Sequence, residues 1–127
     1  MEEKNECIFC KIVNGEVPST KVYEDDNFIG ILDINQVAEG KTLLIPKKHY
    51  KTLLDMPNSL GNEMLESVKK IALKLIDEGK AEGFNLLMNN FEVAGQVVPH
   101  AHIHILPRKK GDGLKGMYLE EMENKKN

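Results

Sequence analysis

The order of hydrophobic and polar positions divides the chain into five short strand-like runs and one longer helical run. Each strand-like run consists mainly of apolar, β-branched or aromatic residues and ends at turn-forming residues. Asp25 and Asp26 stand between the first two runs, which predict a hairpin. Pro46 and Pro107 follow the third and fifth runs and are predicted to end them. The predicted strands are residues 21–24, 27–32, 42–45, 84–88 and 100–106.

Between the third and fourth runs lies a segment with helical periodicity. Its apolar residues recur at steps of three and four, which places them on one face of a helix. Asn58 or Ser59 is predicted to cap its N-terminus, and Gly79 is predicted to end it. Strands followed by a helix and then by further strands predict an α+β fold with a largely antiparallel sheet. The apolar face consists of Leu60, Met64, Val68, Ile71, Ala72, Leu75 and Ile76.

Length and composition are those of an ordinary globular protein. The 127 residues suffice for one domain with one core, and 41% of them are hydrophobic and 29% charged. The net charge of −3 argues against nucleic acid as a partner, because nucleic-acid binders usually carry a basic surface. No apolar run approaches the ~20 residues of a membrane span, and the N-terminus lacks the pattern of a signal peptide. We therefore expect a cytoplasmic protein without a membrane partner.

Three of the four histidines stand at alternate positions in the last predicted strand. Side chains alternate between the two faces of a strand, so His100, His102 and His104 are expected to share one face, while Ala101 and Ile103 face the core. A row of three imidazoles suits metal binding, or a division of nucleophilic and acid–base roles. The alternative is a solvated polar face that happens to use histidine.

The segment that precedes the histidines, residues 89–96, is a predicted loop that carries several amides. Asn89, Gly95 and Gln96 could donate hydrogen bonds to phosphate oxygens beside the histidines. The alternative is an ordinary polar connection between two strands.

The chain has two cysteines, Cys7 and Cys10, in a Cys-x-x-Cys spacing. In a reducing compartment this spacing favours metal or redox chemistry over a structural disulfide. A redox pair is expected within a βαβ pattern, which is absent around these residues, so half of a metal site is the better interpretation. Its other ligands must come from elsewhere in the chain. The alternative is a small apolar cluster of unlinked cysteines with Ile8 and Phe9.

The run His-x-His-x-His of residues 100–104, followed by two apolar residues, resembles the motif of the histidine-triad (HIT) family of nucleotide hydrolases and transferases. The resemblance extends over about residues 6–110 and implies a single HIT domain, with residues 111–127 as a C-terminal tail. Further segments resemble family landmarks and occur in the family's order: residues 7–12 (CIFCKI), 15–18 (GEVP), 23–26 (YEDD), 32–34 (LDI) and 44–49 (LIPKKH).

The resemblance implies a fold, an assembly and roles for individual residues. The fold is the HIT fold, a five-stranded antiparallel sheet with two helices, usually paired as a homodimer. His102 is implied as the nucleophile, His104 and Asn89 as phosphate contacts, and Asp33 as the contact of the ribose hydroxyls. Gly95, Gln96 and Val97 also stand where the family holds the α-phosphate, although Val97 replaces a hydroxyl residue that is common there. The nucleoside pocket is implied for Phe9, Ile12, Phe28, Ile31, Leu32 and Ile34, and a structural zinc for Cys7, Cys10, His49 and His100.

The function that these residues imply is hydrolysis of a purine nucleotide at its α-phosphate. The substrate is expected to be a nucleoside phosphoramidate or a dinucleoside polyphosphate, cleaved through a covalent nucleotidyl-histidine and without magnesium. One alternative is a zinc hydrolase that uses all three histidines as metal ligands, although it leaves the cysteines without a role. Another is a regulatory protein that binds nucleotides with little turnover.

Overall fold

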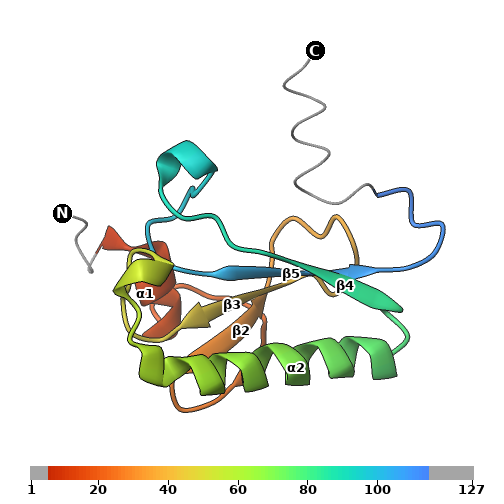
Figure 1. Cartoon of the computed structure of the whole chain (residues 1–127), viewed down its shortest axis with the longest axis horizontal. Coiled ribbons are helices and arrows are strands. Elements are labelled where there is room, and N and C mark those ends of the chain that lie inside the picture. Colours follow the sequence, from red (N-terminus) through yellow and green to blue (C-terminus); the bar gives the residue numbers. More distant parts are fainter. Residues whose placement is uncertain (1–5, 115–127) are drawn as a thin grey trace.

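Residues 6–114 are described by a computed structural model, in which five antiparallel strands form a sheet with one α-helix on each face (Figure 1). The strand order is β1-β2-β3-β5-β4, which agrees with the predicted α+β fold. In these residues no helix has the length and apolar character needed to cross a membrane. The α-helices and strands are α1 (Ile8–Val13), β1 (Lys21–Glu24), β2 (Phe28–Leu32), β3 (Thr42–Pro46), α2 (Gly61–Asp77), β4 (Gly83–Leu87) and β5 (Ile103–Arg108).

Alternation of side chains along the central strands supplies two separate hydrophobic clusters. Ile29 and Ile31 of β2 pack with Phe9 of α1 on one face of the sheet. Phe28 of the same strand is fully buried on the other face, together with Ile71 of α2. The sheet is therefore covered on both sides, and residues two apart in β2 or β3 serve the same cluster.

The predicted hairpin is tied to α2 by the carboxylate of Asp25. Its Oδ2 accepts hydrogen bonds from the hydroxyl of Tyr23 at 2.6 Å and from that of Ser67, in α2, at 2.7 Å. Ser67 is completely buried, so these bonds fix the hairpin against the helix away from bulk water.

Two predictions about element ends are wrong. Asn58 and Ser59 do not cap α2, because a 3₁₀ turn, Asn58–Leu60, runs directly into the helix and Leu60 occupies the N-cap position. Pro107 does not end β5 but lies within it. The pairing of β5 with β3 stops at Ile105, so the missing N–H of Pro107 removes no hydrogen bond on that side.

The strand predicted for residues 100–106 begins only at Ile103, so two of the three histidines precede β5. The alternation of side chains nevertheless continues. His104 lies opposite Leu43 on the face of the sheet that carries α1, and the rings of His102 and His104 are 5.0 Å apart. His102 is only 6% exposed and His100 is fully buried, which excludes a solvated polar face.

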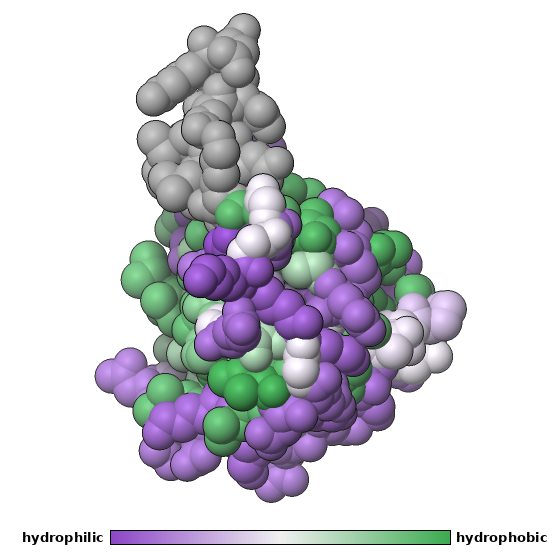
Figure 2. All heavy atoms as spheres, turned by 90° about the vertical axis from the view of Figure 1, so that its right-hand side faces the viewer, coloured by the Kyte–Doolittle hydropathy of each residue, from purple (hydrophilic) through white to green (hydrophobic). Residues whose placement is uncertain are grey.

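Not all hydrophobic side chains are buried. The space-filling view of the end of the molecule on the right of Figure 1 shows hydrophobic residues exposed among mainly hydrophilic ones (Figure 2). The apolar face predicted for α2 is wrong at one position: Ile76 was expected to face the core but is 40% exposed.

Candidate active site and metal centre

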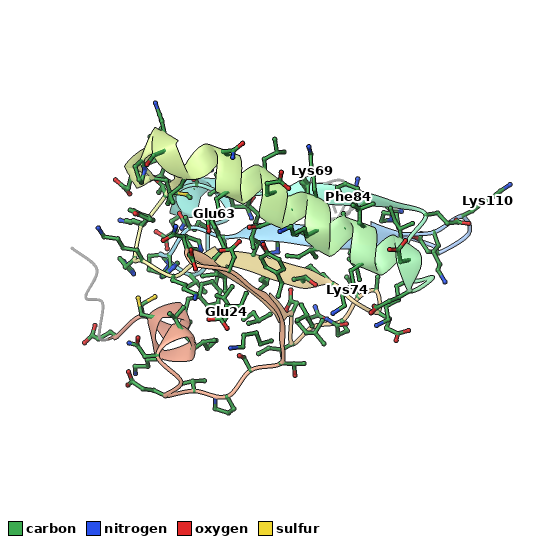
Figure 3. All side chains as sticks on the ribbon, turned by 90° about the horizontal axis from the view of Figure 1, so that it is seen from below. Glu24, Glu63, Lys69, Lys74, Phe84 and Lys110 are labelled. Atoms are coloured by element: carbon green, nitrogen blue, oxygen red, sulfur yellow. The ribbon has the colours of Figure 1, made fainter. Side chains whose placement is uncertain are left out.

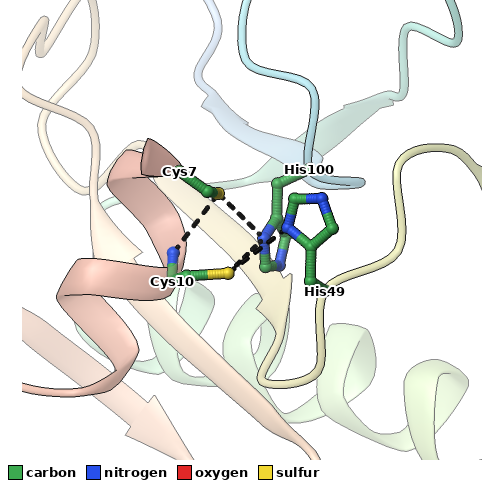
Figure 4. Close-up of side chains that lie close together, drawn as sticks. All are labelled: Cys7, Cys10, His49 and His100. Carbon is green, nitrogen blue, oxygen red and sulfur yellow. Dashed lines mark hydrogen bonds between the residues drawn. The ribbon is translucent and has the colours of Figure 1, made fainter. Parts of the chain in front are cut away.

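Four potential metal ligands from three separate segments converge beside α1 (Figure 4). Cys7 is the N-cap residue of α1 and Cys10 lies in the helix, whereas His49 follows β3 and His100 precedes β5. Cys7 Sγ lies 3.3 Å from Nδ1 of His100, and Cys10 Sγ lies 3.3 Å from Nδ1 of His49. The four ligand atoms all lie within 4.8 Å of one another.

The spacing and the protonation of this cluster fit a tetrahedral zinc ion. Typical zinc–sulfur and zinc–nitrogen bonds give a sulfur–nitrogen edge of about 3.5 Å in a tetrahedron. Nε2 of His100 donates a hydrogen bond of 2.8 Å to the carbonyl of Pro46, so the unprotonated Nδ1 faces the sulfurs. Burial lowers the pKa of His100 from 6.5 to about 4, which keeps this imidazole neutral. The cluster contains every residue that the resemblance implied as a zinc ligand.

The hydrogen bond of His102 determines which of its ring nitrogens keeps a free lone pair. Nδ1 of His102 lies 2.7 Å from the carbonyl oxygen of His100. A carbonyl only accepts hydrogen bonds, so Nδ1 carries the proton and Nε2 keeps its lone pair. The ring of Phe9 meets the His102 ring edge to face at 5.0 Å and further restricts its orientation. His102 is therefore held in the tautomer that a nucleophile requires.

Burial also keeps the two neighbouring histidines of the site neutral. It lowers the pKa of His102 below 6.5, although the bond to the His100 carbonyl acts in the opposite direction. It lowers the pKa of His104 from 6.5 to about 4, and the positive charge of Lys41 adds to this effect. Nδ1 of His104 is buried and has no hydrogen-bond partner within residues 6–114. A buried ring nitrogen of this kind suits a contact with a bound ligand.

A buried ion pair lies beside the two histidines. Nζ of Lys41 is 2.5 Å from Oδ2 of Asp33, and the side chain of Lys41 is only 3% exposed. Burial is the largest single influence on the pKa of Asp33 and would raise it, but the hydrogen bonds from Lys41 and from the N–H of Asn35, together with the positive charge of Lys41, lower the pKa below its usual value. Asp33 is thus ionised and fixed, and Lys41 is a residue of the site that the sequence did not suggest. No spacing or motif distinguishes it from the other lysines.

The loop before the histidines is held by hydrogen bonds of two amide side chains, those of Asn89 and Gln96. Asn89 lies in the loop, and its side-chain amide donates a hydrogen bond of 3.3 Å to the carbonyl of Gly95. Gln96 was expected to bind phosphate, but its side chain is buried and already bonded to the backbone. It accepts from Phe91 N–H and donates to the carbonyls of Lys51 and Val98. Gln96 therefore braces the loop and is not a phosphate ligand.

Only part of the predicted nucleoside pocket lies on the face of the histidines. Phe9, Ile12 and Ile31 belong to the hydrophobic cluster beside α1, on that face. Phe28 packs against α2 on the opposite face, and Leu32 lines a cavity there, so neither can line a pocket beside the histidines. The expectation for these two residues was wrong because positions 28, 30 and 32 of a strand point away from positions 29 and 31.

Two further residues of the expected site are largely exposed. Ile34 follows Asp33 and its side chain is fully exposed, and Val97 is 89% exposed. Neither side chain belongs to the hydrophobic core, so both are accessible to a ligand.

The fold and the cluster of histidines agree with a known family. Residues 14–111 match the HIT domain, and the chain belongs to this family. A zinc-bound histidine triad family protein from Mycobacterium smegmatis has a similar structure, with a TM-score of 0.83 and 39% sequence identity over 89% of this chain and 82% of that one. The predicted HIT fold is confirmed by this similarity.

Some relatives carry names that state an activity, among them the following two. The adenylylsulfatase HINT3 of Arabidopsis thaliana is 47% identical over 111 residues, which are 87% of this chain and 56% of that protein. The chain thus spans little more than half the length of this relative. The adenosine 5'-monophosphoramidase HNT1 of Candida albicans is 43% identical over 107 residues, which are 81% of this chain and 70% of that protein.

Proposed function

We propose that this protein hydrolyses nucleoside 5'-phosphoramidates, and related substrates with a leaving group on the α-phosphate, by nucleophilic attack of His102. The observation that carries this proposal is the hydrogen bond of His102 Nδ1 to the His100 carbonyl, which leaves Nε2 as a neutral nucleophile. The names of the Arabidopsis and Candida relatives support it, because both activities cleave a bond at the phosphorus of a nucleotide.

The reaction takes place in two displacements at phosphorus. The lone pair of His102 Nε2 forms a bond to the α-phosphorus, and the bond to the leaving nitrogen breaks with its electron pair. The leaving amine takes a proton from solvent. Water then attacks the phosphorus of the nucleotidyl-histidine, the P–N bond to His102 breaks, and a proton returns to solvent. The products are a nucleoside monophosphate and the free amine, and His102 is regenerated.

His104 and Asn89 are proposed to stabilise the charge on the non-bridging phosphate oxygens. His104 has an unpartnered buried nitrogen in the described part of the chain, and Asn89, with its amide donor, lies two residues beyond Leu87, which pairs with His104. Donors fixed before the reaction stabilise developing charge without reorganisation. These groups take the place of a magnesium ion, so the reaction is expected to need no added divalent cation.

The turnover assay that tests this function compares adenosine and guanosine phosphoramidates with dinucleoside polyphosphates. The wild type should release a nucleoside monophosphate, and His102→Ala should release none while still binding the monophosphate, since Asp33 and the apolar residues are unchanged. Binding without turnover by the wild type would favour a regulatory nucleotide-binding role. Activity that brief EDTA treatment removes and magnesium restores would contradict the metal-independent mechanism.

The cysteine–histidine cluster is proposed to hold a structural zinc ion. Four protein ligands leave no open position for an activated water, so zinc bound there would link α1, the segment after β3 and the start of the histidine run. In residues 6–114, Cys7, Cys10, His49 and His100 form the one group of this kind, and His102 and His104 do not belong to it. This arrangement disfavours a zinc hydrolase with all three histidines as ligands.

A homodimer is proposed through the outer face of α2 and the neighbouring edge strand β4. Both elements expose large apolar side chains, and β4 has no partner strand on its outer side within the described sheet. Phe84 and Leu86 point to the α2 side of the sheet, and Figure 3 shows Phe84 beside the helix. A second copy would cover this surface and the strand edge together. The exposed apolar residues are Leu65, Leu73, Ile76, Phe84 and Leu86, which are 40–58% exposed.

A further inference from the structure

Phe91 adopts a backbone conformation that favours glycine. Its φ is 75° and its ψ is 153°, and within residues 6–114 it is the one residue other than glycine with a positive φ. Residues with a Cβ atom rarely occupy this region, and where they do the strain often accompanies a functional role. A phenylalanine at this position is therefore expected to contribute something that a glycine would not.

The hydrogen bonds that hold this conformation do not involve the ring. The N–H of Phe91 donates to Oε1 of Gln96 at 2.7 Å, and its carbonyl accepts from the N–H groups of Ala94 and Gln96. Gln96 is itself fixed by its bonds to the backbone of Lys51 and Val98. A glycine at position 91 would make the same bonds without strain, so the loop does not need the phenyl ring to fold.

The ring is also poorly buried, and it has apolar neighbours in the loop. Phe91 is 47% exposed, Val93 98% and Val97 89%. The only charged residue between positions 91 and 98 is Glu92. Exposed apolar side chains gathered in one segment indicate a contact with an apolar group. A leaving group with several negative charges would find no cationic side chain in this loop.

The register of the sheet indicates that this loop and Asp33 lie on opposite sides of His102 and His104 along the strands. Leu87 of β4 pairs with His104, so Asn89 is level with His102, and the loop lies beyond it. Asp33 follows Leu32, the last residue of β2, which pairs with Thr42 of β3. Thr42 in turn pairs with Ile105, which lies on the other side of His104 from His102. A nucleoside held at Asp33 with its phosphate at His102 therefore has its leaving group on the side of the loop.

The loop also rises on the correct face of the sheet. Around Glu92–Ala94 it extends away from the sheet on the side opposite α2 (Figure 1), and the histidines face the side of α1, which is also opposite α2. An in-line displacement places the leaving group outward from the nucleophile, toward the space that this loop borders.

We propose that Phe91, Val93 and Val97 form a leaving-group subsite, and that the preferred substrates are nucleoside phosphoramidates whose amine carries an aromatic or aliphatic group. This inference rests on the proposed function and specifies its substrate class. It predicts that substrates with an apolar amine as the leaving group are cleaved with a higher kcat/KM than substrates that release ammonia or a polyphosphate.

Phe91→Gly tests this subsite with two substrates, unsubstituted adenosine 5'-phosphoramidate and its N-(2-phenylethyl) derivative. The variant should lower kcat/KM for the phenylethyl substrate about 5–20-fold and leave that for the unsubstituted one within about twofold, because only the larger amine reaches the ring. The melting temperature should rise, since glycine removes the strain. Phe91→Leu, which keeps an apolar side chain, should retain most of the preference.

Three results would overturn the inference. Equal losses for both substrates would show that the ring supports the phosphate site instead of the leaving group. Unchanged kinetics with weaker self-association in sedimentation would place the ring at a subunit contact. A wild type with no preference for the phenylethyl substrate would exclude an apolar subsite. If the wild type cleaves neither substrate, the proposed function fails as well. If it cleaves the unsubstituted substrate but shows no preference for the phenylethyl one, only the apolar subsite is refuted.

Discussion

Replacement of Asp33 by asparagine should destabilise the protein strongly, and a second replacement at Lys41 should restore most of the loss. The carboxylate of Asp33 is paired with the ammonium of Lys41, whose side chain is only 3% exposed. Removal of one partner of a buried ion pair costs about 3–5 kcal/mol, because the other charge is left uncompensated. The side chain of Asp33 is 18% exposed, so water can reach the vacated position and the lower end of this range applies, about 3 kcal/mol.

The magnitudes differ for the two single variants. Lys41→Met leaves the more accessible Asp33 carboxylate, which also accepts a hydrogen bond from Asn35 N–H, and should cost about 1–2 kcal/mol. The double variant has no buried charge and should lie within about 1 kcal/mol of the wild type. For a domain of this size a loss of 3 kcal/mol corresponds to a melting temperature about 10 °C lower.

Thermal unfolding of the wild type, both single variants and the double variant at pH 7 completes a double-mutant cycle. A coupling energy of about 3–5 kcal/mol is expected, since the two single losses sum to more than the loss in the double variant. The pair's contribution should also depend on pH, because the folded-state pKa of Asp33 lies below 3.8. The stabilisation is present above 3.8 and is lost as the pH falls through the lower folded-state value. Additive effects of the two single replacements at pH 7 would refute the account of this ion pair.

Four further predictions follow from the site and from the helix surface. Protein purified without chelator should contain close to one zinc ion per chain, and Cys7→Ser should lose both the zinc and thermal stability. Zinc that Cys7→Ser keeps but His102→Ala loses would show instead that His100, His102 and His104 bind the metal. His104→Ala or Asn89→Ala should lower kcat by ~10–1,000-fold with a smaller loss of monophosphate binding, and equal losses in both would remove their role in the transition state. Burial lowers the pKa of His104 from 6.5 to about 4, so between pH 4 and pH 6.5 the unfolded chain binds more protons than the folded one. The denaturant midpoint should therefore fall as the pH decreases across this range, and a midpoint that does not change with pH would contradict the burial of His104. Leu73→Lys should convert a dimer into a monomer in sedimentation, and an unchanged dimer would exclude this face.

The elements of the fold could be predicted from the sequence because their patterns are local. The five strand-like runs and the periodic apolar face of α2 overlap the observed elements closely. The errors lie where a distant partner decides the outcome. Pro107 lies inside β5 because β3 ends its pairing at Ile105, and no local signal reports how far a neighbouring strand extends.

The same limit applies to the site. The Cys–His cluster proposed to hold zinc could be predicted from the Cys-x-x-Cys spacing together with the family resemblance, since spacing alone left two ligands unassigned. Phe28 and Leu32 were placed in the pocket although alternation along β2 already puts them on the face opposite Ile31; what the sequence did not show is which of the two faces carries the histidines. The roles of Lys41 and Phe91 depend on burial and on a backbone angle, neither of which is encoded in a motif.

The central claim is that His102 carries the nucleotidyl group during turnover. The most direct measurement is rapid acid- or base-quenched mass spectrometry of the wild type after mixing with adenosine 5'-phosphoramidate, followed by digestion and sequencing of the modified peptide. The account predicts a transient increase in mass by one adenylyl group, located on His102 and lost as the monophosphate is released, and no such species with His102→Ala. Turnover by the wild type with no adduct at any time, and undiminished turnover by His102→Ala, would contradict it.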